Sequence, residues 1–430
     1  MRARTWAWLV VVVVYCCAAW LTLPWRREPL PFFMDDWDFA GELLRLSPVQ
    51  YLFAPQGSGH VFPFFKAIYG ALMLALDFDA QGLRLMQFVC RWTMLFMWLA
   101  MLRRAGKLDP FTGLCLVPLV ANEVGILDTY LWGVELCHEM ALLTAVGLLY
   151  AVYRFVFLQT GRSSTIALWC IAGCWSFSVG LVMPIAAFLS LLVFRPGKGT
   201  ETRAVKARTA ILAGFAIGLS AFLYSAGSPE TLALRIPPSD AAGQILTAFY
   251  VGSLLNPGLS GLRVATTPGL ANVAYLVVLV CGVAVLTLRR RSQPETFLVL
   301  ASLMASIGVG VLIAATRAGS GPIYASSYRY NLNHIAFEAP VVAVLVATTS
   351  MPMRAVVALI AAGLALAGTA RGGPGFDVIA RERSRCVQDI IRSTTPAPAC
   401  LSTVYHRSDP ERLRWVAHAL EGHGPFKVKE

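Results

Sequence analysis

Three carboxylates follow the first hydrophobic run of the chain, in the segment 34–39, which reads MDDWDF. Asp35, Asp36 and Asp38 stand between apolar residues in a chain that has 24 acidic and 36 basic residues. A carboxylate can act as a general base, and neighbouring carboxylates can hold a divalent cation. We therefore predict that Asp35 and Asp36 are catalytic, or are the ligands of a divalent cation if one is bound, and that Asp38 contacts a substrate.

The same acids also fit the first turn of a helix. Apolar residues recur at helical spacing from Trp37 to Leu46, which predicts an amphipathic helix that lies flat on a membrane. Acidic side chains are favoured at a helix N-terminus because they interact with the helix dipole. Capping accounts for one acid such as Asp36, but it does not require three.

Composition predicts the elements that position these residues. Hydrophobic residues make up 57% of the chain and charged residues 14%, with a mean hydropathy of +0.63. These values are typical of an all-α polytopic membrane protein. Apolar runs of about 17 to 25 residues predict about eleven transmembrane helices, at 6–24, 83–102, 111–127, 136–157, 164–177, 180–194, 209–225, 269–288, 295–315, 333–350 and 355–370.

Lysine and arginine follow alternate spans, which predicts a cytoplasmic N-terminus. The loops that then face outward are 25–82, 128–135, 226–268, 316–332 and the tail 371–430. We expect a transmembrane domain over 1–370, with the acids in its first outer loop, and a small extracytoplasmic tail over 371–430. The predicted location is the plasma membrane, the inner membrane of a bacterium. The net charge of +12 then indicates contact with membrane lipid rather than nucleic acid.

Residues 61–76 are apolar, but the segment is short and contains Pro63 and Lys66. Counting it as a span would reverse the charge pattern of every later loop. We predict an interfacial or re-entrant helix, with Lys66 reaching to the lipid headgroups.

The tail has two cysteines, Cys386 and Cys400, and this topology places them in an oxidising compartment. We expect them to form a disulfide. Residues 376–393 and 409–421 of the tail have helical patterns, and Ser408 and Asp409 precede Pro410 as a helix start would.

Further polar residues collect in the predicted outer loops. Two arginines in the run RAGSGPIYASSYRY could hold a phosphate, because a guanidinium binds phosphate through two hydrogen bonds. Asn333 and His334 begin the tenth span, where polar groups are costly unless they face a cavity. With Asp38, the predicted substrate-binding residues are His60, Lys66, Arg84, Glu135, Arg317, Arg329 and Tyr330. The alternatives are an interfacial histidine for His60 and a membrane anchor for Arg84.

The first hundred residues resemble the GT-C superfamily of integral membrane glycosyltransferases. The resemblance rests on a cytoplasmic N-terminus, an acidic motif just after the first helix, a long outer loop, and Gly82–Leu85 (GLRL) opening the second span. It implies a polyprenyl-phosphate sugar as donor, Asp35 or Asp36 as the base and Arg84 as the arginine at the start of the second helix. The acidic motif here is Asp-Asp-Trp-Asp, whereas the family shows Asp-Glu.

The acidic motif and this resemblance together predict that the protein transfers a sugar from a polyprenyl phosphate to a hydroxyl of a glycan or lipid acceptor in the cell envelope. The alternatives are a lipid-linked saccharide transporter, for which no internal repeat is visible, and a non-catalytic subunit of an envelope assembly. No glycine-rich phosphate loop follows a strand, and a lipid-phosphate donor needs none.

Overall fold

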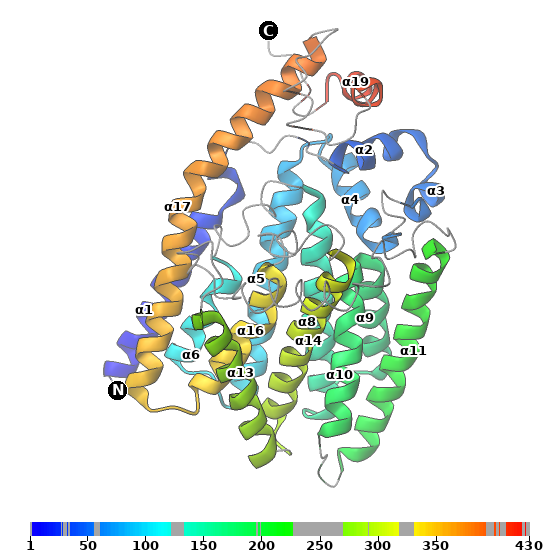
Figure 1. Cartoon of the computed structure of the whole chain (residues 1–430). Coiled ribbons are helices and arrows are strands. Elements are labelled where there is room, and N and C mark those ends of the chain that lie inside the picture. Colours follow the sequence, from blue (N-terminus) through cyan, green and yellow to red (C-terminus); the bar gives the residue numbers. More distant parts are fainter. Residues whose placement is uncertain are drawn as a thin grey trace.

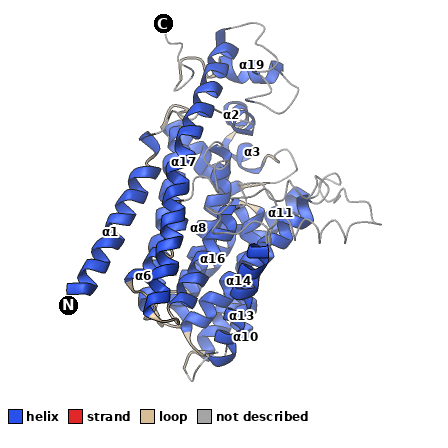
Figure 2. Cartoon of the chain, turned by 60° about the vertical axis from the view of Figure 1, so that its left-hand side comes forward, coloured by secondary structure: helices blue, strands red, loops and turns tan. Residues whose placement is uncertain are grey.

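The computed structural model describes residues 2–26, 28, 32, 35–55, 61–121, 133–194, 197, 199–226, 270–290, 292–317, 331–392, 400, 404, 410–423 and 426. These residues form helices and the turns between them, with no strand among those described (Figure 2). The all-α part of the predicted fold class is confirmed.

The longer helices form a bundle (Figure 1). They are α1 (Arg2–Thr22), α5 (Gln81–Arg104), α8 (Leu136–Val156), α9 (Ser163–Ser176), α10 (Val182–Val193), α11 (Glu201–Ala226), α13 (Leu270–Arg289), α14 (Pro294–Arg317), α16 (Asn331–Val346) and α17 (Met351–Arg392). Four short helices lie at one end of this bundle, namely α2 (Asp35–Arg45), α3 (Pro48–Phe53), α4 (Pro63–Ala75) and α19 (Pro410–Ala419). The remaining short helices are α6 (Pro110–Leu114) and the 3-10 turns η1 (Pro24–Arg26), η2 (Val117–Leu119), η4 (Gly133–Glu135) and η5 (Ser178–Leu181).

Five helices in the described part of the chain are long and apolar enough to cross a membrane: α1, α5, α8, α14 and α17. Their length and apolar composition are consistent with a helical membrane protein. The predicted eleven crossings and their orientation stay predictions. Every predicted span except 111–127 coincides with a helix or with part of one.

The helix α8 lies in the middle of the bundle, packed against α5, α9, α10 and α14. Nearly all of its side chains are buried, which explains its apolar sequence on every face. Because α5 and α8 both extend to the end where α2 and α4 lie, their first turns support that end (Figure 1).

The prediction of one span over 111–127 is wrong for the residues that the structure describes. The short helix α6 and the turn η2 stand there instead. Pro110 is the first residue of α6, and Asp109 before it caps the helix, because its Oδ1 accepts a hydrogen bond from Thr112 N at 2.9 Å. Pro118 lies within η2. A proline lacks the backbone N–H that a continuous helix needs, so Pro118 interrupts the run.

The predicted boundary at residue 370 lies inside α17, which continues from the bundle into the tail. Its C-terminal half packs against the segment after α1: Glu28 N donates to Asp377 Oδ1 at 3.1 Å, and Arg381 pairs with Glu28 at 3.2 Å. Pro374 lies within the helix and removes one backbone donor. The two predicted helices, 355–370 and 376–393, are therefore parts of one helix, α17.

A disulfide joins Cys386 on α17 to Cys400, with Cα atoms 5.4 Å apart. It fastens the chain that leads from α17 to α19. The helix α19 lies within the predicted 409–421 and packs on both α17 and α2. The tail therefore folds back over the acidic motif.

Candidate functional site

The acidic motif forms the first turn of α2, where the helix dipole favours negative charge. Asp36 through Glu42 are all buried. Trp37 packs edge to face against Phe32 and Phe426, and Phe39 packs against Phe65 of α4. The apolar side of α2 therefore contacts protein, and the prediction that it rests on lipid is wrong for these residues. The cause is that α4 and the tail, including α19, both pack onto α2.

Asp36 is fully buried where α2, α4 and η4 meet. Its Oδ2 accepts a hydrogen bond from Gly133 N at 3.2 Å, and the Tyr69 hydroxyl lies 3.5 Å from its Oδ1. Burial, and then the charge of Asp36, raise the pKa of Tyr69 well above its usual value. Tyr69 therefore stays protonated and can donate to the carboxylate, so these two partners are neutral donors.

Gly133 permits this approach. A Cβ at this position would collide with Leu83 and lie 3.0 Å from Asp36 Oδ1. Only glycine has no Cβ, so the backbone N–H can reach the carboxylate. Leu83, in the first turn of α5, completes the wall next to Asp36.

Asp38 is buried and pairs with Arg412 of α19 at 3.0 Å. A carboxylate that a guanidinium holds in this way fastens two helices together. The structure thus gives Asp38 a contact with α19, whereas the sequence predicted a contact with substrate.

Asp35 is the first residue of α2 and is partly exposed. The part of the chain that the structure describes has no group of three or more His, Cys, Asp or Glu side chains placed to hold a metal ion. A divalent cation at Asp35 and Asp36 stays a prediction.

Lys66 does not reach to lipid headgroups, which corrects the prediction. Its side chain is 0% exposed, and its Nζ pairs with Glu42 at 2.8 Å and donates to the Ala54 carbonyl at 2.8 Å. Burial lowers the pKa of Lys66, while the hydrogen bond and charge of Glu42 oppose that shift. The ion pair with Glu42 of α2, which was not predicted from the sequence, joins α4 to α2.

Arg84 lies in the first turn of α5, as predicted, but it is buried rather than anchored in lipid. Its Nη1 donates to the Glu28 carbonyl at 3.0 Å and to Gln81 Oε1 at 3.2 Å. The guanidinium stacks over Phe376 at 4.3 Å. Arg84 therefore positions α17 and the segment after α1.

A second group of charges continues from this site into the bundle. Glu135 lies 3.3 Å from His138 Nε2, and the His138 ring packs on Phe177 with ring centroids 4.1 Å apart. One turn deeper, Arg91 of α5 pairs with Glu139 of α8, and both are buried. Glu135 is one of the predicted substrate-binding residues, whereas Arg91 was not predicted. An arginine inside an apolar run was the signal, because such residues need a partner within the protein.

A third polar group lies between α14 and α16. Ser306 Oγ is 3.0 Å from His334 Nδ1 and donates to Glu338 Oε1 at 2.7 Å. Both amide atoms of Asn333 and the Nε2 of His334 are buried without a hydrogen-bond partner. Asn333 and His334 were noted in the sequence, and Glu338, an acid within an apolar run, was not.

The remaining predicted residues cannot be placed in the site. His60, Arg329 and Tyr330 lie outside the residues that the structure describes. Arg317 ends α14, and its side chain is likewise outside the description.

No protein-family model matches this chain, and no curated protein sequence matches it significantly.

Proposed function

We propose that this protein is a membrane glycosyltransferase, which moves a sugar from a polyprenyl phosphate to an acceptor hydroxyl at the extracytoplasmic face of the plasma membrane. The observation that supports it most is the buried Asp36 carboxylate, which contacts Gly133 N–H and lies near the Tyr69 hydroxyl. A base in such surroundings is shielded from water and held in one orientation.

Asp36 is the best candidate among the acids of α2. Asp38 is paired with Arg412, and Glu42 is paired with Lys66. Each of these two carboxylates would have to break an ion pair before it could approach an acceptor hydroxyl. Asp36 is fully buried where α2, α4 and η4 meet, beside the Gly133 N–H and the Tyr69 hydroxyl. Asp35 is partly exposed, so it is less shielded from water than Asp36.

In the proposed reaction, Asp36 takes the proton of the acceptor hydroxyl. The hydroxyl oxygen forms a bond to the anomeric carbon of the donor sugar, while the bond from that carbon to the phosphate oxygen breaks. The lipid phosphate leaves with the electron pair, and a single displacement inverts the anomeric centre. Because Asp36 is buried before substrates bind, the segment that carries Gly133 must move aside when the acceptor enters.

The phosphate of the donor needs cationic partners. Arg317 and Arg329 are the proposed ones, from their charge and spacing in the sequence. Lys66 is no longer a candidate, because its ammonium is engaged by Glu42 and the Ala54 carbonyl.

The test is release of polyprenyl phosphate by purified protein in nanodiscs, measured by mass spectrometry with polyprenyl-phosphate hexoses and pentoses and an extract of envelope acceptors. Asp36→Asn should lower the rate about 100-fold or more, as for loss of a general base. Asp35→Asn is the matched control and should retain most activity. Full activity of Asp36→Asn would reject the catalytic assignment, and movement of an unchanged lipid-linked sugar across the membrane would instead indicate a transporter.

The face of the membrane is tested by cysteine labelling in intact cells. Ser58→Cys lies in the first predicted outer loop and should react with a membrane-impermeant maleimide, in a background that lacks the exposed Cys16, Cys17 and Cys281. Reaction only after the cytoplasmic side is opened would place the acidic motif on the wrong face for this proposal.

A further inference from the structure

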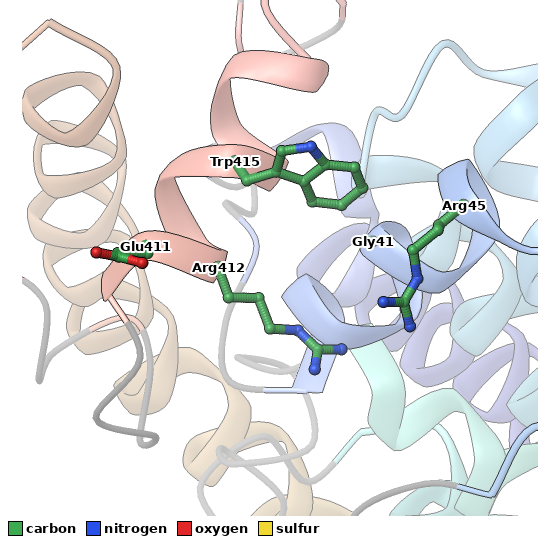
Figure 3. Close-up of a pocket in the computed structure, with 5 residues that line it drawn as sticks. All are labelled: Gly41, Arg45, Glu411, Arg412 and Trp415. Atoms are coloured by element: carbon green, nitrogen blue, oxygen red, sulfur yellow. The ribbon is translucent and has the colours of Figure 1, made fainter.

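A pocket of about 450 Å³ lies between α2 and α19, on the surface that the tail brings over the acidic motif. It is lined by Gly41, Arg45, Glu411, Arg412 and Trp415 (Figure 3). Gly41 is five residues from Asp36 on the same helix, which corresponds to about 7.5 Å along its axis. Five residues also turn the helix by about 140°, and Arg45 projects about 180° from Asp36 around the same helix. The pocket is therefore near the proposed base along α2, but on the other side of the helix, which faces α19.

The charges in the pocket suit an anion. Figure 3 shows the guanidinium groups of Arg45 and Arg412 on one side of Trp415, whereas the carboxylate of Glu411 points away from them. Arg45 is exposed and has no ion pair with any residue that the structure describes. Arg412 keeps one side on Asp38, and its side chain is 34% exposed. A guanidinium binds carboxylate or phosphate through two parallel hydrogen bonds.

Trp415 adds a flat apolar surface beside these cations. The residue is 48% exposed, although its helix has a well-buried side that includes Leu413 and Val416. A wide aromatic face beside a few polar groups is a common arrangement in sites for small polar ligands. The C–H face of a sugar ring can stack on such a surface while a charged substituent reaches the arginines.

Gly41 shapes the floor of the pocket. A Cβ there would lie 2.9 Å from Val416 Cγ2 and 3.5 Å from the Trp415 ring. A larger residue would push α19 away from α2, so the glycine lets the two helices make one surface.

We propose that this pocket binds an anionic sugar unit of the acceptor, a sugar that bears a carboxylate or a phosphate. The sugar ring stacks on Trp415, and the anionic group bridges Arg45 and Arg412. This role in the acceptor site rests on the proposed function, but binding itself does not require transfer.

The test measures binding directly, by isothermal titration calorimetry of the full chain in nanodiscs of neutral lipid, with no lipid-linked donor present. Digalacturonate and glucose 6-phosphate are the anionic sugar probes. Digalactose is the neutral comparison, inorganic phosphate supplies the anion alone, and nanodiscs with phosphatidylglycerol supply a competing lipid headgroup. We expect an anionic sugar to bind at least about tenfold more tightly than digalactose, a difference of about 1.4 kcal/mol.

Arg45→Gln should weaken binding of the anionic sugar by about tenfold or more and leave the thermal unfolding midpoint unchanged. The matched control is Arg103→Gln, since Arg103 is also an exposed arginine in the last turn of a helix, α5. It should bind as the unmodified protein does. Trp415→Leu should weaken binding of both anionic and neutral sugars.

Three results would overturn the inference: equal affinity for digalacturonate and digalactose, inorganic phosphate binding as tightly as the anionic sugars, or Arg45→Gln leaving their affinity unchanged. Loss of sugar binding in phosphatidylglycerol nanodiscs would assign the pocket to a lipid headgroup and would also overturn it. If the pocket does not bind the anionic sugars but the protein still transfers a sugar from the lipid-linked donor, the proposed function stands. Binding without any transfer by the unmodified protein rejects the proposed function and leaves the sugar site in place.

Discussion

The backbone N–H of Gly133 donates to Asp36 Oδ2 at 3.2 Å, although 97 positions separate the two residues in the chain. The bond joins η4, which leads into the central helix α8, to the first turn of α2. The acidic motif is thus positioned by the bundle core and not only by its own helix. A change at Gly133 tests that relationship without altering the carboxylate.

Gly133→Ala should lower both stability and any Asp36-dependent activity. The added Cβ would collide with Leu83 and lie 3.0 Å from Asp36 Oδ1. Overpacking of this kind costs roughly 1 to 3 kcal/mol. Thermal unfolding, followed by tryptophan fluorescence, should show a lower midpoint. Gly197→Ala is the control, because no atom lies within 4 Å of a Cβ at that position. Equal midpoints for the two variants would show that Gly133 is not constrained.

The pair of Lys66 and Glu42 predicts a strong asymmetry between single and double variants. Both side chains are buried, so Lys66→Met leaves a carboxylate without its cation. Loss of one partner from a buried pair costs roughly 3 to 5 kcal/mol, whereas replacing both by apolar residues is often close to neutral. The double variant Lys66→Met with Glu42→Leu should therefore unfold at a higher temperature than Lys66→Met. Additive losses in the double variant would contradict the pairing.

The same lysine predicts how stability varies with pH. Burial lowers the pKa of folded Lys66 below its usual 10.5, despite the opposing effect of Glu42. Between the lowered pKa and 10.5, the unfolded chain binds more protons at this site than the folded protein. The contribution of Lys66 to stability therefore rises with pH in that window. The unfolding midpoint of the unmodified protein minus that of Lys66→Met should increase as pH approaches 10.5, and a decrease would contradict the sign.

Local signals in the sequence predicted several elements near the site. Helix α2 begins at Asp35, where acids favour an N-terminus, and α4 begins at Pro63 inside the predicted segment 61–76. With 13 residues, α4 is shorter than a membrane span needs. These features depend only on residues that are close together in the chain, so the sequence alone could predict them.

Contacts between distant segments were not predictable in this way. Lys66 finds Glu42 on another helix, and Asp38 finds Arg412 in the tail. An apolar stripe such as that of α2 has the same pattern whether lipid or α19 covers it. The acidic residues could be located in the sequence, but the partners of Asp36, Asp38 and Glu42 in the structure depend on packing.

The disulfide between Cys386 and Cys400 should stabilise the tail. In the chain-entropy model, a disulfide that closes a loop of this length raises the free energy of the unfolded chain by about 3 kcal/mol, which stabilises the folded protein. A reductant should lower the unfolding midpoint of the unmodified protein and leave that of Cys386→Ser with Cys400→Ser unchanged. Both cysteines should react with a maleimide only after reduction. Reaction without reductant in protein from an oxidising compartment would contradict the bond.

Asn333→Leu should raise stability and lower activity. Both amide atoms of Asn333 are buried and have no hydrogen-bond partner, so the side chain loses its hydration on folding without compensation. An unsatisfied buried polar group costs roughly 1 to 3 kcal/mol, and leucine of similar size removes that cost. The unfolding midpoint of the purified variant should therefore rise.

A residue that weakens the fold in this way is expected where function requires a polar group. Asn333 neighbours His334, whose Nε2 is also buried without a partner, next to Ser306 and Glu338. If this group binds a substrate or moves with it, Asn333→Leu loses release of polyprenyl phosphate while gaining stability. Thr144→Val is the control, because the Thr144 hydroxyl already donates to the Ala141 carbonyl at 2.8 Å. It should neither gain stability nor lose activity. A stabilised Asn333→Leu with full activity would show that the group between α14 and α16 has no part in transfer.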